Sequence, residues 1–177
     1  MAKKLKMAKK LKFQVVLEEF LSILEWKDEL KVDEEQQWVQ LIGVVKIGDY
    51  TGGKLVIEAS DKTEIAGVFI YLPFECKDAK RSEMMFLLNE LNTRGPNGGY
   101  GCLQLMDDAR IRWVQRVDFE GSSPSAKSIE QMVGPGWDRC AAFIEAIRSV
   151  AVTKKSASQT LEELDSPDLL DAGDSEL

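Results

Sequence analysis

Apolar residues recur at the spacing of an α-helix in the first part of the chain. Between Phe13 and Leu24 they lie three and four residues apart, which is the pattern of an amphipathic helix. The apolar members of this helix are Phe13, Val16, Leu17, Phe20, Leu21 and Leu24. The pattern predicts a first helix that ends between Trp26 and Glu29.

The pattern changes to that of strands after this helix. Residues 38–47 are rich in β-branched and aromatic residues and stop at Gly48, and Gly52-Gly53 separates them from a second strand over 54–60. A third strand over 64–74 is apolar on both alternating faces, with Ile65, Phe69 and Tyr71 on one face and Val68, Ile70 and Leu72 on the other. Either a helix or a partner subunit must therefore cover its second face.

A second helical stripe contains Met84, Leu87, Leu88 and Leu91. Asp78 or Ser82 is expected to cap this helix at its start. Gly95-Pro96 is expected to end it, because proline disfavours helical geometry in the residue before it.

Two more strands follow and form a hairpin. They span 100–106 and 110–119 and turn at Asp107-Asp108-Ala109. The aspartates would suit a metal or an acid–base pair, but the turn itself selects aspartate, so a turn is the preferred interpretation. On the second strand the core positions alternate with a basic face that carries Arg110, Arg112 and Arg116.

A last helical region opens at Ser125 or Ser128. Gly134-Pro135-Gly136 interrupts it, which predicts a kink or two short helices. Apolar positions resume beyond the interruption at Trp137, Cys140, Ala141, Ile144 and Ile147.

The two ends of the chain differ in charge from the part between them, which is expected to form a single domain over 13–152. Residues 1–12 read MAKKLK twice, carry six lysines and no acid, and are interpreted as a disordered extension or as a processing feature. Residues 153–177 hold two lysines against seven acids and are expected to be a disordered acidic tail. Thr160 and Glu163 offer the alternative of a capping box that starts a short helix there.

Composition narrows the class of function. Apolar residues make up 44% of the chain and charged residues 30%, without an apolar run long enough to span a bilayer. No secretory signal pattern follows the basic N-terminus, so we expect a cytoplasmic protein without a membrane partner. The formal net charge of −7 argues against a general nucleic-acid binder, because such proteins need a basic face.

Several kinds of active site are excluded by residue type. The chain has no histidine, and its three cysteines are far apart, so neither a metal site nor a disulfide framework is expected. Without histidine the usual general base is missing, and we expect neither an enzyme nor a cofactor. The glycine-rich loop RGPNGGYG leaves a helix C-terminus, where the helix dipole opposes a bound phosphate.

Two sets of residues are candidates for contacts with other molecules. Arg110, Arg112 and Arg116, together with the lysine-rich N-terminus, would suit RNA, although pairing of the arginines with acids such as Glu58 is preferred. Aromatic side chains that would anchor a protein partner are Trp38, Phe69, Tyr71 and Trp137, and burial of the two tryptophans in the core is an equal alternative.

The order of elements resembles the YbjN-like family, whose domains share the fold of type III secretion chaperones. The likeness is carried by Asn89 and Asn92 in LLNELNTR, then by YGCLQLMDD, RIRWVQRVDFEG and SAKSIEQMV. We expect Asn92 to end the second helix in a left-handed conformation and Asn89 to bond the connecting backbone.

The resemblance implies one α+β domain in the order α-β-β-β-α-β-β-α, with an antiparallel sheet of about five strands and helices packed on it. It further implies a homodimer without a cofactor that binds other proteins or acts in regulation. The preferred hypothesis is thus a small acidic protein-binding module, chaperone-like or regulatory. A nucleic-acid-binding regulator that uses the arginine stripe is the alternative.

Overall fold

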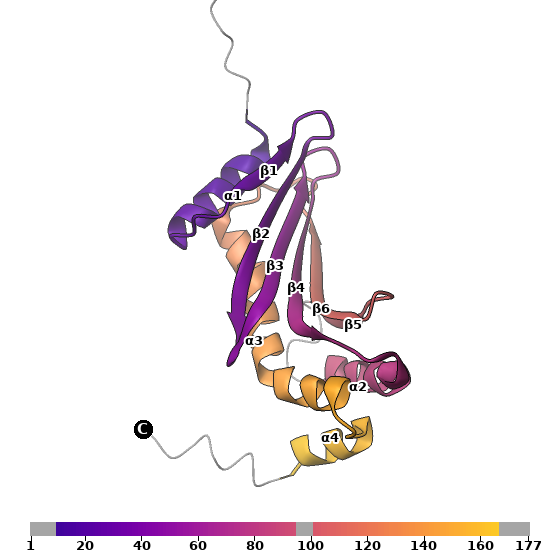
Figure 1. The fold of residues 1–177 in the computed structure, drawn as a ribbon. Coiled ribbons are helices and arrows are strands. Elements are labelled where there is room, and N and C mark those ends of the chain that lie inside the picture. Colours follow the sequence, from indigo (N-terminus) through magenta and orange to yellow (C-terminus); the bar gives the residue numbers. More distant parts are fainter. Residues whose placement is uncertain (1–9, 95–100, 167–177) are drawn as a thin grey trace, which may run out of the picture.

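The chain folds into one antiparallel sheet with helices packed on one of its sides (Figure 1). The computed structural model describes residues 10–94 and 101–166. The elements are α1 (Lys12–Ile23), β1 (Leu30–Asp33), β2 (Trp38–Ile47), β3 (Tyr50–Ser60), β4 (Ile65–Glu75), η1 (Asp78–Lys80), α2 (Arg81–Thr93), β5 (Cys102–Leu105), β6 (Arg110–Asp118), α3 (Ala126–Val152) and α4 (Ala157–Leu164). The strand order is β1-β2-β3-β4-β6-β5. The predicted α+β class is confirmed, with six strands in the described residues rather than about five.

The strand that the sequence analysis missed is β1. It pairs with β2 from Leu30 opposite Leu41 to Asp33 opposite Trp38. The four residues alternate apolar and polar as LKVD, but only Leu30 is partly buried and the three residues after it are exposed, so the strand is too short and too exposed to give a clear pattern. The other strands were predicted within a few residues of their ends.

Helices α1 and α3 cover the same side of the sheet, and the core lies between them and the strands (Figure 1). Side chains that point to this side come from alternate positions of each strand, such as Leu41, Ile57 and Ile70, all fully buried. Of the helices in the described residues, none is both long and apolar enough to cross a bilayer.

The closest approach of a helix to the sheet occurs at Trp113 of β6. Its indole is 1% exposed. A Cβ atom on Gly136 of α3 would lie 2.3 Å from this ring, and a Cβ atom on Gly101 would lie 2.4 Å from it. Because side-chain carbons do not pack so closely, both positions require glycine for α3 and the strand to close on the indole.

Of the two alternatives predicted at Gly134-Pro135-Gly136, the two short helices are wrong. Helix α3 continues through Pro135 as one helix of 27 residues. Ser125 caps it, as expected, and its hydroxyl accepts a hydrogen bond from the Ser128 N–H at 3.1 Å. Gly136 is therefore needed for packing against Trp113 and does not break the helix.

The first helix is capped by a residue from elsewhere in the chain. Leu11 precedes α1 and offers no side-chain cap. The carboxylate of Asp61, in the turn between β3 and β4, instead accepts hydrogen bonds from the backbone N–H groups of Lys12 at 2.5 Å and Phe13 at 2.9 Å. The helix thus begins inside the extension predicted for residues 1–12, of which 1–9 lie outside the described residues.

The predicted role of Asn92 is wrong, whereas the role predicted for Asn89 involves the loop over 95–100, which lies outside the described residues. Asn92 lies inside α2, where its Oδ1 accepts a hydrogen bond from the Leu103 N–H at 2.8 Å and its Nδ2 donates to the Leu103 carbonyl at 3.0 Å. Asn92 therefore ties the helix to β5. Asn89 is exposed and makes no side-chain hydrogen bond in the described part of the chain.

The end of α2 is held by a side chain of α3. Arg139 donates hydrogen bonds to the carbonyl oxygens of Leu91 and Arg94, the second at 2.9 Å. Burial lowers the pKa of Arg139. The positive charge lies at the negative end of the helix dipole, where cations are favoured. At the other end of α2 the predicted caps are wrong, because the η1 turn precedes the helix and no side chain caps it.

The tail predicted over residues 153–177 differs in its first part. Ala157–Leu164 form α4, which packs on α2 and α3. Ser156 caps this helix by accepting a hydrogen bond from the Gln159 N–H at 3.2 Å, whereas Thr160, the predicted cap, is buried. So short a helix is stabilised by its tertiary neighbours, which local composition does not reveal. The rest of the tail and the loop over 95–100 lie outside the described residues.

We predict that Gly136→Ala lowers the free energy of unfolding by about 1–3 kcal/mol, because the new methyl group overlaps the Trp113 indole. Gly134→Ala is the matched control in the same helix, since no heavy atom lies within 4 Å of the position that its Cβ would take. Its effect should stay below about 1 kcal/mol. Urea denaturation followed by tryptophan fluorescence measures both. Equal effects at the two positions would contradict the close approach.

A second prediction concerns the capping of α1. Asp61→Ala should cost about 1–2 kcal/mol of stability, because two backbone N–H groups lose their acceptor. Asp49→Ala is the control, since the Asp49 side chain is almost fully exposed and touches only Lys46, at 3.8 Å. Thermal unfolding by circular dichroism compares the two. If Asp61→Ala leaves the melting temperature unchanged, the Asp61 carboxylate does not stabilise the start of α1.

Candidate functional site

The side of the sheet opposite α1 and α3 has no helix over it in the described residues (Figure 1). The pairing register arranges its side chains in rows that run from β6 through β4 and β3 to β2. The rows are Asp118–Ile65–Ser60–Trp38, Arg116–Gly67–Glu58–Gln40, Val114–Phe69–Val56–Ile42 and Arg112–Tyr71–Lys54–Val44. These rows, with Arg110 beyond them on β6, are called the open face below.

Arginines of β6 cover the aromatic rings at the centre of the open face. The Cζ atoms of Arg112 and Arg116 lie 4.9 and 5.7 Å from the ring centroid of Phe69. Arg110 and Arg112 lie 4.9 and 5.9 Å from the centroid of Tyr71. Phe69 is therefore only 4% exposed although no helix lies over it. The expectation that a helix or a subunit must cover this face of the strand is wrong for Phe69, because arginine stems and guanidinium groups cover it.

The arginine stripe is not neutralised in the way that we expected. Glu58 accepts a hydrogen bond from Gln40 Nε2 at 2.8 Å and pairs with no arginine. Among residues 10–94 and 101–166, no carboxylate oxygen lies within 4.0 Å of a guanidinium nitrogen of Arg112 or Arg116. The open face therefore carries positive charge on a protein whose formal net charge is −7.

Arg110 and Arg112 are held in different ways. Asp108 neutralises Arg110, with 2.6 Å between Oδ2 and Nη2. The hydrogen bond from Arg110 lowers the pKa of Asp108, and the same contact raises the pKa of Arg110. Arg112 donates instead to neutral oxygen atoms, Oε1 of Gln104 at 3.1 and 3.2 Å and the hydroxyl of Tyr71 at 3.2 Å. Among the described residues, the arginines of the open face without a carboxylate partner are thus Arg112 and Arg116.

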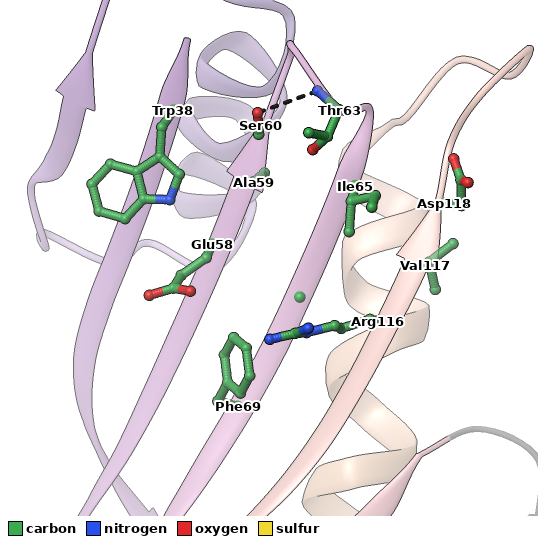
Figure 2. A pocket seen from close by; sticks show the side chains of 11 residues that line it. Trp38, Glu58, Ala59, Ser60, Thr63, Ile65, Phe69, Arg116, Val117 and Asp118 are labelled. Carbon is green, nitrogen blue, oxygen red and sulfur yellow. Dashed lines mark hydrogen bonds between the residues drawn. The ribbon is translucent and has the colours of Figure 1, made fainter. Parts of the chain in front are cut away.

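A shallow hollow of about 380 Å³ lies at one end of the open face (Figure 2). Its apolar sides are formed by Trp38 of β2 and by Ile65 and Phe69 of β4, and the Arg116 side chain borders it from β6. Gly67 has no side chain, and the Phe69 ring lies close over it, since a Cβ atom there would be 3.1 Å from that ring. The hollow thus places an apolar surface directly beside a guanidinium group.

The structure brings together most of the residues singled out in the sequence. Trp38, Phe69 and Tyr71 lie on the open face with the three arginines. Trp137 does not join them, because it lies on α3 and is partly buried against the core. It is therefore removed from the candidate site.

Sequence reasoning missed three apolar members of the open face. Ile42 and Val44 lie on β2 and Val56 lies on β3. Val44 is 78% exposed, the highest value among the large apolar side chains of the described residues. The available signal was the apolar character of both alternating faces in WVQLIGVVKI. This pattern predicts a strand, but it does not by itself show that one of the two faces stays exposed.

The hairpin turn was predicted correctly. β5 and β6 are joined through Met106 to Ala109, and Ala109 adopts a positive φ of 68°. Asp108 bonds the backbone and side chain of Arg110. In the part of the chain that the structure describes, no three acidic or cysteine side chains gather as a metal site would require.

Comparisons with known proteins found one structural likeness and no sequence relative. No family model matches the chain, and no curated protein matches it. Among solved structures, a chain of the HopA1-SchA chaperone-effector complex aligns with a TM-score of 0.49 and 16% identity. The alignment covers 80% of this chain and 94% of that chain.

The stacking of arginine on Phe69 is open to measurement. In a double-mutant cycle of Arg112→Ala and Phe69→Leu, we expect a coupling energy of about 0.5–1 kcal/mol. The same cycle with Arg110→Ala should give a coupling near zero, because Arg110 stacks over Tyr71. Chemical denaturation of the single and double variants supplies the energies. Equal coupling in both cycles would contradict the geometry.

Proposed function

We propose that this protein is a non-enzymatic protein-binding module, chaperone-like or regulatory, which binds its partner on the open face of the sheet. The observation that carries the proposal is the open face itself. It combines exposed apolar side chains, a shallow hollow and two arginines without carboxylate partners. Aromatic residues and arginine are the residue types most enriched at protein interfaces.

The likeness to the YbjN-like family agrees with this proposal but is carried by the sequence motifs alone. The absence of histidine from the chain supports a role without catalysis, since no side chain titrates near neutral pH without a strong shift of its pKa. A homodimer also stays a prediction. The open face cannot serve both as the interface between two copies and as the surface for a different partner.

Nucleic-acid binding is the second candidate function, favoured by the arginines on an exposed sheet. Proteins that bind single strands on a sheet stack bases on exposed aromatic rings. Here Phe69 is nearly buried beneath Arg112 and Arg116, and a base would have to displace a guanidinium group to stack on it. Coverage of the ring therefore favours a protein partner.

Site-specific photo-crosslinking in the native lysate tests the proposed function. A benzophenone amino acid at Val44 on the open face should give protein adducts, and one at Ile23 of α1 is the control, since both side chains are exposed. The combined change Arg112→Glu and Arg116→Glu should abolish the adducts at Val44. Light scattering of the same variants shows whether the adduct is a second copy of the chain.

Two results would count against the proposal. Adducts that survive the charge reversal would place the partner elsewhere on the molecule. RNA retained by the wild type, lost on the charge reversal and unaccompanied by any protein adduct would favour the nucleic-acid alternative.

A further inference from the structure

We infer that the partner of the open face is an extended acidic segment, in which a large apolar residue and an aspartate or glutamate stand two positions apart. This inference rests on the proposed function, because it specifies the chemistry of the protein that the open face binds. The hollow takes the apolar side chain, and the arginines beside it take the carboxylates.

The hollow fits a single large apolar side chain. Its accessible apolar walls are Trp38 and Ile65, whereas Phe69 is only 4% exposed and its ring lies over Gly67. Ile65 is 40% exposed, so the apolar surface is accessible. Burying such a side chain supplies about 25 cal/mol for each Å² of apolar surface removed from water.

The arginines beside the hollow can bind carboxylates. Arg116 stacks over Phe69 and makes no side-chain hydrogen bond with the described residues. Arg112 uses its three nitrogen atoms toward Gln104 and Tyr71, which fix its orientation without neutralising it. Both guanidinium groups are therefore held against the sheet before binding, and a carboxylate accepts from such a planar group with two parallel hydrogen bonds.

The spacing of these features fits an extended chain. Arg116 and Gly67 stand opposite each other on β6 and β4, so the guanidinium group borders the hollow from the next strand. In an extended segment, side chains two positions apart point to the same side and lie about 6.6 Å apart. One turn of a helix would instead bring together residues three and four apart. An acid two positions from the apolar residue thus reaches β6 while the apolar side chain fills the hollow.

Two acidic side chains in the hollow disfavour the binding of a uniform polyanion such as a nucleic acid. Glu58 and Asp118 line it together with Arg116. A nucleic-acid backbone crossing the open face would place phosphates near both carboxylates, and like charges at close range repel each other. A peptide reduces this repulsion because its single carboxylate lies at Arg116 and its apolar residue faces the acids in the hollow. The pattern of charge, and not only its sign, therefore favours a protein segment.

Selection from a displayed library of random peptides of about ten residues tests this inference, since a segment of that length spans about 33 Å when extended. The full-length protein is the bait. We expect the enriched peptides to contain an acidic residue two positions from a large apolar residue, in either direction. Enrichment of basic peptides, or of apolar peptides without acids, would overturn the inference, as would failure to enrich any peptide.

Affinity measurements on one enriched peptide then locate its site. Arg116→Gln should weaken binding by about tenfold, because a charge-assisted hydrogen bond is lost. Lys127→Gln on α3 is the matched control, since Lys127 is exposed and pairs only with Glu130, at 2.8 Å, and its change should leave affinity within about twofold. Trp38→Ala should weaken the same peptide through the hollow. Circular dichroism of each variant verifies that it is folded.

Substitution of Glu58 tests the charge pattern. Glu58→Gln should raise the affinity for a single-stranded RNA of uridines by a larger factor than the affinity for the peptide, because the Glu58 carboxylate repels a phosphate at every nucleotide but only one acid of the peptide. Tighter binding of RNA than of any enriched peptide by the wild-type protein would overturn the inference.

The two proposals fail in distinguishable ways. If the enriched peptides lack acids while the adducts at Val44 still disappear on reversal of Arg112 and Arg116, the partner chemistry is wrong and the proposed function stands. If the adducts also survive the reversal, both are wrong.

Discussion

The close contact of α3 with Trp113 determines how this protein is built. A large indole lies at the centre of β6, and Gly101 and Gly136 leave room for the strand and the helix to close on it from two directions. This contact holds the middle of α3 against one side of the sheet. With α1 beside it, the core is complete on that side, and the other side is left to the side chains of the strands themselves.

A sheet face without a helical layer must still shield its apolar residues from water. On β4 the shielding comes from arginines of the neighbouring strand, whose stems and planar groups lie over Phe69 and Tyr71. This arrangement removes apolar area from water while keeping charge at the surface, and an exposed apolar patch would otherwise favour association. The same side chains then serve as the candidate binding surface, so covering the sheet and recognising a partner use one set of contacts.

Several hydrogen bonds between side chains and backbone connect residues that are distant in sequence. Asp61 caps a helix that begins 49 residues earlier, and Asn92 exchanges two hydrogen bonds with the backbone of Leu103. Arg139 of α3 binds the carbonyl groups at the end of α2. Local pattern predicts that a helix ends near a given place, but it does not say which distant side chain satisfies the free backbone groups there. The missed cap of α1 and the misassigned role of Asn92 are errors of that kind, whereas the Ser156 cap of α4 is local.

The sequence by itself determined the order of the longer helices and strands, though not β1 or α4, together with most strand boundaries and the hairpin turn, because apolar periodicity and turn chemistry act over a few residues. It also identified the arginine stripe on β6 and the aromatic residues of the open face. Only the tertiary structure decided that Trp137 lies apart from them, that α3 passes through Pro135 without a break, and that Glu58 binds Gln40 rather than an arginine. Those outcomes depend on which strands become neighbours and on how closely a helix approaches them, and neither property is contained in a local stretch of residues.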